Sequence, residues 1–210
     1  MNKIVSFMLA AIIVAGSPSI ASSSDEVAYA KNFEVYPLTQ EIIEISNIGD
    51  WHTPYLNAFV ARGGRLIYSG TPNDINASWW LEKARSVTLN INAIRDWSDT
   101  FLSDFVAYGG KIIYSGQAGD VNGQWWHDRA PAVTLKIKNI DEWRSEFLSH
   151  FISLGGHVIF IGEPIAINGV WWLNRAPSIT LLVKNRRDWN QNFLIDFINS
   201  GGKVRFKSGV

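Results

Sequence analysis

Residues 133–178 read VTLKIKNIDEWRSEFLSHFISLGGHVIFIGEPIAINGVWWLNRAPS, and this stretch decides the fold. Residues 133–138 alternate apolar and polar side chains and include β-branched ones, a pattern typical of a strand. Residues 141–152 place five large apolar side chains on one face of a helix. The pair Gly155-Gly156 ends this helix, because glycine adopts the left-handed conformation without a Cβ clash.

The rest of the stretch predicts two further elements. Residues 157–161 form a second apolar strand, and residues 169–175 form a short helix after Asn168, a residue type favoured at helix N-caps. Ala176-Pro177 stops the short helix, since the residue before proline avoids the α region. The unit is therefore strand, long helix, strand, short helix.

This unit recurs every 46 residues. Residues 94–139 and 140–185 match at 21 of 46 positions without a gap. A fixed period indicates one supersecondary unit that is copied along the chain. The residues that keep the step are Trp51, Trp97, Trp143 and Trp189, and the glycine pairs that begin at 63, 109, 155 and 201. We expect one α/β domain over 41–210, with repeats near 41–86, 87–132, 133–178 and, in part, 179–210.

Eight strands follow from the repeat, separated by seven helices. Strict alternation of strand and helix predicts a parallel sheet with right-handed crossovers. The strands are expected near 41–46, 65–69, 87–92, 111–115, 133–138, 157–161, 179–184 and 203–207.

The sheet could close or stay open. A compact (β/α)8 barrel is our expectation, because such a barrel is filled by alternate strands and a fourfold two-strand repeat supplies that pattern. An open α/β solenoid is the alternative, and a doubly wound sheet is a third arrangement. The polar face of Thr134, Lys136 and Lys138 favours the solenoid, since it suits a solvated concave sheet better than a packed interior.

Residues 1–21 are expected to be a signal peptide. Lys3 precedes an apolar run over 4–15 that is too short to span a bilayer, and Ser19-Ile20-Ala21 is a small-x-small cleavage site. We expect cleavage after Ala21 and an N-terminal arm over 22–40 that covers one end of the domain. No later run is long enough for a transmembrane segment.

The amino-acid composition limits the compartments and the functions that the protein can have. The 210 residues carry 19 basic and 19 acidic side chains, which argues against a nucleic-acid partner. The absence of cysteine excludes disulfides, thiolate nucleophiles and cysteine-based zinc sites, and favours a bacterial protein that is periplasmic or secreted. The four histidines lack metal-site spacing, so no metal or cofactor is expected.

Ten tryptophans are the strongest compositional signal, and six of them form adjacent pairs. Adjacent helical residues point about 100° apart, so one indole of each pair is expected to pack on the sheet and the other to lie near the surface. An exposed indole could stack on a sugar ring; alternatively, all six fill gaps in the packing. The pairs are Trp79-Trp80, Trp125-Trp126 and Trp171-Trp172.

Polar residues follow the second, fourth and sixth strands, at the end of a parallel sheet where ligands bind. Asn76, Asn122 and Asn168 are candidate ligand-binding residues, or else helix N-caps. Lys83, Arg129 and Arg175 follow the tryptophan pairs. They could bind anions, stack on an indole, or offset a helix dipole.

Catalysis would need unlike groups in the repeats. Glu163 with Asp120 or Asp74 could form the carboxylate pair of a glycosidase. His127 is also particular to one repeat.

We therefore expect a secreted or periplasmic binding protein, lectin-like, for a carbohydrate or cell-envelope ligand, and not an enzyme. A small barrel hydrolase that uses Glu163 and Asp120 is one alternative. A protein that interacts with other proteins or with itself through exposed edge strands is another.

Overall fold

The computed structural model describes residues 41–206, except 76, 122, 165–166 and 168. The expected signal peptide over 1–21 and arm over 22–40 lie outside these residues, as do Asn76, Asn122 and Asn168. Every expected strand is present, and its ends lie close to the expected ones. The strands are β1 (Ile42–Ile45), β2 (Arg65–Tyr68), β3 (Val87–Ile91), β4 (Lys111–Tyr114), β5 (Val133–Ile137), β6 (His157–Phe160), β7 (Ile179–Val183) and β8 (Lys203–Phe206).

Seven α-helices connect the strands in the described part of the chain, four long and three short. The long helices are α1 (Thr53–Ala61), α3 (Asp99–Ala107), α5 (Ser145–Ser153) and α7 (Gln191–Asn199), and the short ones are α2 (Ala77–Glu82), α4 (Gln124–Asp128) and α6 (Val170–Leu173). None of them has the length and apolar character that a membrane span requires.

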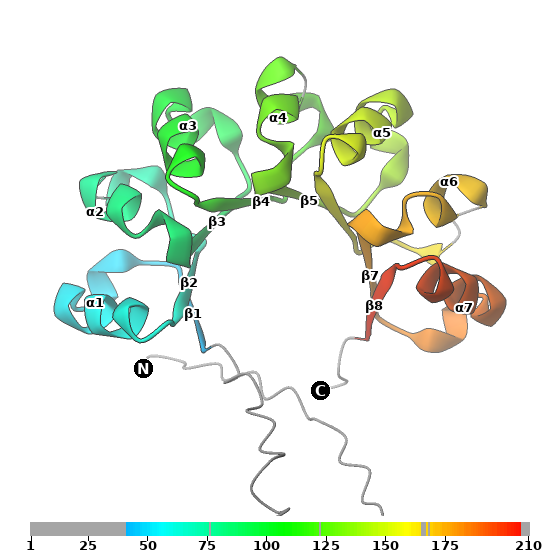
Figure 1. Cartoon of the computed structure of the whole chain (residues 1–210), viewed down its shortest axis with the longest axis horizontal. Coiled ribbons are helices and arrows are strands. Elements are labelled where there is room, and N and C mark those ends of the chain that lie inside the picture. Colours follow the sequence, from blue (N-terminus) through cyan, green and yellow to red (C-terminus); the bar gives the residue numbers. More distant parts are fainter. Residues whose placement is uncertain (1–40, 76, 122, 165–166, 168, 207–210) are drawn as a thin grey trace, which may run out of the picture.

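The sheet has the strand order β1-β2-β3-β4-β5-β6-β7-β8, and every pair is parallel. The expected eight-stranded parallel α/β sheet is thus confirmed. No hydrogen-bonded pair joins β8 to β1 among the described residues, and the strands form an open arc with all helices outside it (Figure 1). Hydrogen bonding therefore corresponds to the open alternative rather than to a closed barrel.

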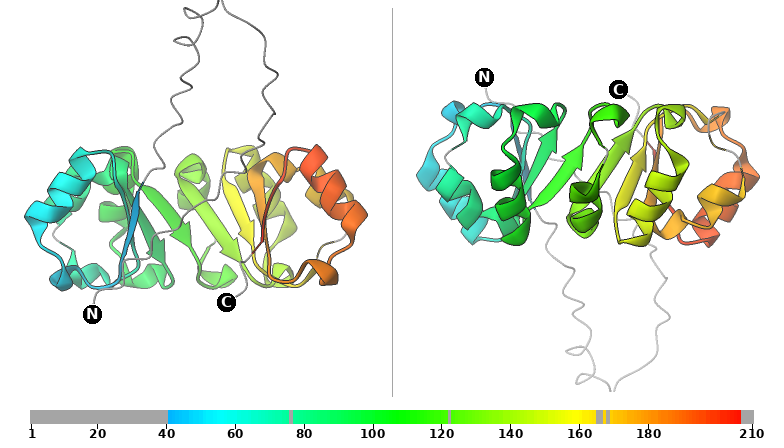
Figure 2. Two further views of the ribbon diagram at one scale, coloured as in Figure 1. Left: turned by 90° about the horizontal axis from the view of Figure 1, so that it is seen from below. Right: turned by 90° about the horizontal axis from the view of Figure 1, so that it is seen from above.

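The arc has a simple physical cause. Neighbouring strands lie about 4.8 Å apart, whereas packed helices need about 8–10 Å between their axes. Helices on one side alone force that side outward, so the sheet curves with its bare face inside. The strands also lie tilted across the arc, which the two side views show (Figure 2).

Alternation along the strands separates the two faces. In β5, Val133, Leu135 and Ile137 are buried under the helices, whereas Thr134 and Lys136 are half-buried on the inner face. β3 and β7 repeat the pattern. Because no helix covers the inner face, it carries polar residues together with half-buried aliphatic ones such as Ile159 and Leu182.

The long helix is shorter than expected. Asp141 and Glu142 lie in a separate 3-10 turn, and α5 begins only at Ser145. Trp143 links the two, with its ring centroid 6.3 Å from that of Phe147. The apolar spacing spans both elements, which is why the sequence pattern reads as one helix.

The glycine pairs act as expected. Gly63, Gly109, Gly155 and Gly201 have φ between 90° and 94°, the left-handed conformation that ends each long helix. The second glycine of each pair lies against a phenylalanine: a Cβ on Gly156 would come within 2.2 Å of the Phe151 ring. The pair thus ends the helix and lets it pack closely on the next strand.

Candidate functional site

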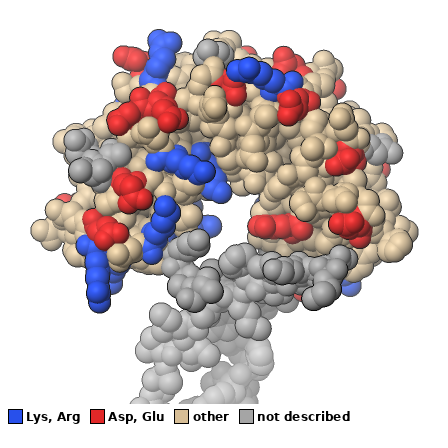
Figure 3. Space-filling view, turned by 180° about the vertical axis from the view of Figure 1, so that it is seen from behind, with Lys and Arg blue, Asp and Glu red and all other residues tan. Residues whose placement is uncertain are grey.

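The inner face of the sheet is a surface that the fold leaves without helices (Figure 1). Five of its strand residues are lysine or arginine, against one acidic residue, Glu44, in a chain whose net charge is zero. Lys and Arg side chains gather beside the central hollow (Figure 3). The basic residues that face inward from the strands are Arg65, Lys111, Lys136, His157, Lys203 and Arg205.

The amino-terminal half of this face carries an uncharged hydrogen-bonded ladder. The Asn90 amide donates to Ser69 Oγ at 3.3 Å, and Ser115 Oγ donates to Asn90 Oδ1 at 3.0 Å. The three residues come from β3 and from the ends of β2 and β4. Amide and hydroxyl groups in a row can exchange hydrogen bonds with a polar ligand.

The paired tryptophans divide as expected into a buried and a more accessible member. Trp80, Trp126 and Trp172 are at most 4 % exposed. Trp126 packs on Tyr114, with ring centroids 5.0 Å apart, and therefore serves the core.

The first tryptophan of each pair is half-buried and held by the preceding long helix. The Nε1 atoms donate to Asn57 Oδ1 at 2.9 Å, Ser103 Oγ at 3.1 Å and Ser149 Oγ at 3.0 Å; the donors are Trp79, Trp125 and Trp171. Repeated indoles thus fasten each short helix to the long helix of the same repeat.

Two of the three basic residues after the pairs stack on these indoles. The guanidinium carbons of Arg129 and Arg175 lie 4.7 Å from the ring centroids of Trp125 and Trp171. Lys83 forms an ion pair with Glu82 instead. Of the three first indoles, two therefore already have a cation on one face.

The candidate carboxylates lie in separate loops, after β2, β4 and β6. Asp120 Oδ1 accepts from Arg95 at 2.6 Å, and its Oδ2 accepts from the Tyr114 hydroxyl at 3.3 Å. Glu163 lies 3.7 Å from Lys184 Nζ. Asp74 accepts from Thr71 Oγ1 at 3.0 Å. Each carboxylate has a local partner, and their contacts do not join them into a pair.

Tyrosines end β2 and β4 beside two of these loops. The Tyr68 hydroxyl donates to the Thr71 carbonyl at 2.8 Å. Burial, and then the charge of Asp74, raise the pKa of Tyr68 to about 12. Burial and Asp120 raise the pKa of Tyr114 as well. These hydroxyls stay protonated and fasten the loops to the strand ends.

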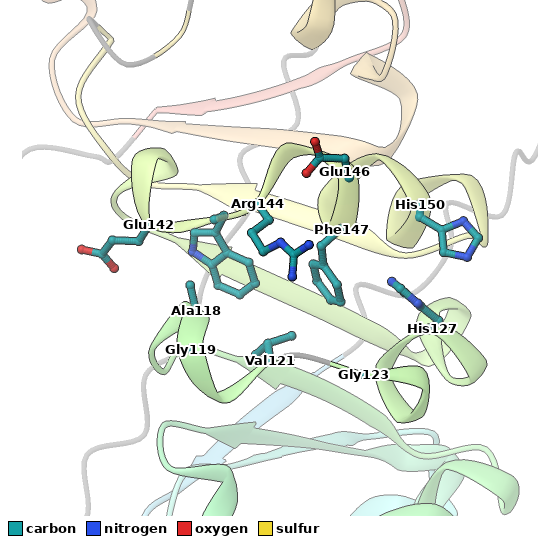
Figure 4. A pocket seen from close by; sticks show the side chains of 11 residues that line it. Ala118, Gly119, Val121, Gly123, His127, Glu142, Arg144, Glu146, Phe147 and His150 are labelled. Carbon is teal, nitrogen blue, oxygen red and sulfur yellow. The ribbon is translucent and has the colours of Figure 1, made fainter.

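A cavity of about 450 Å³ lies on the outer side, between α4 and α5 (Figure 4). His127 and His150 face each other at one end of it, with Arg144 and Phe147 beside them, and Trp143 also lines the cavity. Burial, and then the charge of His150, lower the pKa of His127. No cluster of three or more metal-binding side chains occurs in the described residues, so the two histidines stand without a further ligand.

The sequence pattern predicts a polar inner face but does not show that basic residues from several strands gather on it. The strand alternation contained the signal, since Lys136 and Lys138 share a face with Thr134. What was missing was the sheet register, which gathers these residues with Lys203 and Arg205 from the last strand.

Comparison of the chain with protein-family models and with curated proteins found no match.

Proposed function

We propose that the protein is a non-catalytic binding protein that acts outside the cytoplasm, in the periplasm or after secretion. Its ligand is a carbohydrate or another polymer of the cell envelope, which lies along the inner face of the sheet. The observation that carries this proposal is the contrast between the two faces. Apolar residues are buried under helices outside, and polar residues such as Asn90 and Lys136 are presented inside.

Curvature supports an extended ligand. Solenoid proteins use their concave surfaces for binding, because equivalent positions of successive repeats line up there. The ladder of Ser69, Asn90 and Ser115 offers donors and acceptors of the kind that sugar hydroxyls require. The indoles serve this proposal as fasteners that keep the scaffold rigid.

A glycan array that contains neutral, carboxylated and phosphorylated polymers tests the binding. We expect binding to at least one class, and weaker binding by Asn90→Ala, which removes the centre of the ladder. Asn199→Ala is the matched control, because Asn199 is exposed at the end of α7, outside the sheet. Equal binding by both variants would show that the ligand binds elsewhere on the protein. Absence of binding to every glycan on the array would contradict the proposal.

The same samples separate binding from hydrolysis. A binding protein leaves the bound polymer intact, so no new reducing ends form during long incubation. Release of reducing ends that is lost in Glu163→Gln, at unchanged stability, would instead establish the hydrolase alternative.

Cell fractionation tests the compartment. We expect the mature protein outside the cytoplasm, with Ser22 as its first residue by mass spectrometry. A cytoplasmic protein that retains Met1 would contradict this part of the proposal.

Self-association is the second candidate function, and the sheet edges favour it. β1 and β8 each have one unpaired side among the described residues, and Ile42 and Phe206 are about half exposed there. Unpaired edge strands are templates for pairing with another chain. Light scattering over a hundredfold range of concentration would reveal assembly, and a constant monomer mass would exclude it.

A further inference from the structure

The carboxyl-terminal half of the inner face carries more cations than the amino-terminal half, where Arg65 and Lys111 face inward together with the acidic Glu44. From β5 to β8 the register aligns Lys136, Ile159, Thr180 and Lys203 in one row. Three strand spacings separate the two lysines of this row, or about 14 Å between their Cα atoms. An uncharged floor therefore lies between two cations.

A second row repeats the arrangement. Arg205 pairs with Leu182 on β7, and the exposed Lys138 directly follows β5, two residues after Lys136. Residues two apart along a strand are about 6.6–6.8 Å apart. Four cations thus surround an uncharged floor that contains Ile159, Thr180 and Leu182.

The first repeats lack this arrangement. Asn90 stands at the repeat position of Lys136, and the inner residue Glu44 stands one repeat before Asn90. The four repeats therefore carry an acid, an amide, a lysine and a leucine in turn at this inner position, so only the third repeat places a cation there.

The acidic residues near this area do not neutralise it. Glu163 pairs with Lys184, at the end of the neighbouring strand β7. No ion pair to Lys136, Lys138, Lys203 or Arg205 is found within the described residues. Cations that lack acidic partners on an inner surface favour an anionic ligand.

From this geometry we infer that the inner face binds a polyanionic polysaccharide, with its acidic groups at Lys136, Lys138, Lys203 and Arg205. This inference rests on the proposed function and names the substrate class for it. Ile159 and Leu182 in the uncharged floor face the apolar side of the sugar rings, and the spaced cations face the carboxylates or other acidic groups. A small single anion could engage only one of these cations.

The decisive experiment measures the affinity of the protein for oligogalacturonate, neutral dextran, polyphosphate and single-stranded DNA at several salt concentrations. We expect the tightest binding to oligogalacturonate, with an affinity that falls as salt rises. The variant Lys136→Gln/Lys203→Gln removes opposite ends of one row and should weaken this binding by about fivefold, because two charge contacts are lost.

The control variant is Arg62→Gln/Arg187→Gln. It makes the same change in charge at two exposed residues outside the sheet and should leave affinity within twofold. Equal weakening by both variants would overturn the inference, because it would show an effect of net charge alone.

The remaining outcomes separate the inference from the proposed function. Salt-independent binding to dextran as tight as to oligogalacturonate would overturn the polyanion assignment and leave the proposed function standing. Tighter binding to polyphosphate or DNA would overturn the assignment to a polysaccharide. Absence of binding to every probe, together with silence on the glycan array, would overturn both.

Discussion

The imidazole rings of His127 and His150 meet edge to face, with centroids 4.5 Å apart, across the boundary between two repeats. His127 also stacks on Phe147, at 4.8 Å between centroids, and its Nε2 atom is buried without a hydrogen-bond partner. The sister repeats have Leu81 and Leu173 at the position of His127. A titratable group thus replaces an aliphatic one at this boundary.

This replacement predicts acid sensitivity. Burial and His150 lower the pKa of His127 in the folded protein, so the unfolded chain binds the proton more readily. The contribution of neutral His127 to the free energy of unfolding is fully present above about pH 6.5, the pKa of histidine in the unfolded chain. It is lost as the pH falls through and below that value. Urea unfolding at pH 7.5 and pH 5.5 should show a smaller loss of stability for His127→Leu than for the unchanged protein.

The neighbouring charges need a control, since Asp128, Glu146 and Arg144 also lie near this boundary. His157→Leu is the control variant, because it makes the same replacement at a histidine that is exposed on the inner face rather than at this boundary. A pH dependence that persists in His127→Leu would assign the effect to other groups.

The two members of a tryptophan pair should differ in their contribution to stability. Trp126→Ala empties a buried site and should lower the free energy of unfolding by about 3–5 kcal/mol. Trp125→Ala loses the hydrogen bond to Ser103 and the contact with Arg129, which should cost about 1–2 kcal/mol. Urea unfolding followed by circular dichroism measures both, and equal losses would contradict the division of roles.

Two glycines of one loop provide a matched test of close packing. A Cβ on Gly116 would lie 2.1 Å from the Asn92 carbonyl oxygen, whereas one on Gly119 would have no neighbour within 4 Å. Gly116→Ala should therefore destabilise the protein by about 1–3 kcal/mol. Gly119→Ala should change stability by less than about 0.5 kcal/mol, as surface substitutions usually do. Melting temperatures of the two variants decide the matter, and a tolerated Gly116→Ala would show that β3 and this loop are not in close contact.

The strand-end tyrosines predict a loss of stability in alkali. The raised pKa of Tyr68, about 12, means that the unfolded chain gives up this proton first, near pH 10. The contribution is present below pH 10 and is lost as pH rises toward 12. Tyr68→Phe/Tyr114→Phe should flatten the decline, and the third repeat already carries Phe160 at this position. An unchanged decline in denaturation curves between pH 9 and pH 11 would contradict this.

Local patterns predicted the elements of the fold well, because they depend on neighbours in the sequence. The alternation at Val133, Thr134 and Leu135 reports burial on one face directly. The left-handed glycine at Gly155 follows from its place after an apolar helical face. Closure of the sheet depends instead on how much room the helices take outside it, which no local pattern encodes.

The stagger of the strands agrees with the tilt of a (β/α)8 barrel, although no hydrogen bond between β8 and β1 closes the sheet among the described residues. Ile43 pairs with Leu66, which pairs in turn with Val87, whereas the repeat equivalent of Ile43 is Leu89, two positions further along β3. Equivalent residues therefore advance by about 7 Å along the strands for every two strands, a tilt of about 35°. That tilt is close to the value of about 36° in a (β/α)8 barrel. The 46-residue period thus accounts for a strand tilt like that of a barrel, but it does not specify pairing between β8 and β1.

The candidate site was predicted only in part for a related reason. Lys136 and Lys203 belong to different repeats and meet on one row only through the register of four strands. The tryptophan pairs, in contrast, recur as identical residues in three repeats, and in the structure most of them pack within the scaffold. Repetition reveals what the scaffold needs, whereas ligand recognition can depend on the positions where the repeats differ.

Each described strand hydrogen-bonds only to the strands that come directly before and after it in the chain. The contacts that build the sheet are therefore local in the sequence. Folding can begin in any repeat and spread to both sides without first closing a long loop. Under mechanical extension, the repeats should likewise unfold one after another rather than all at once.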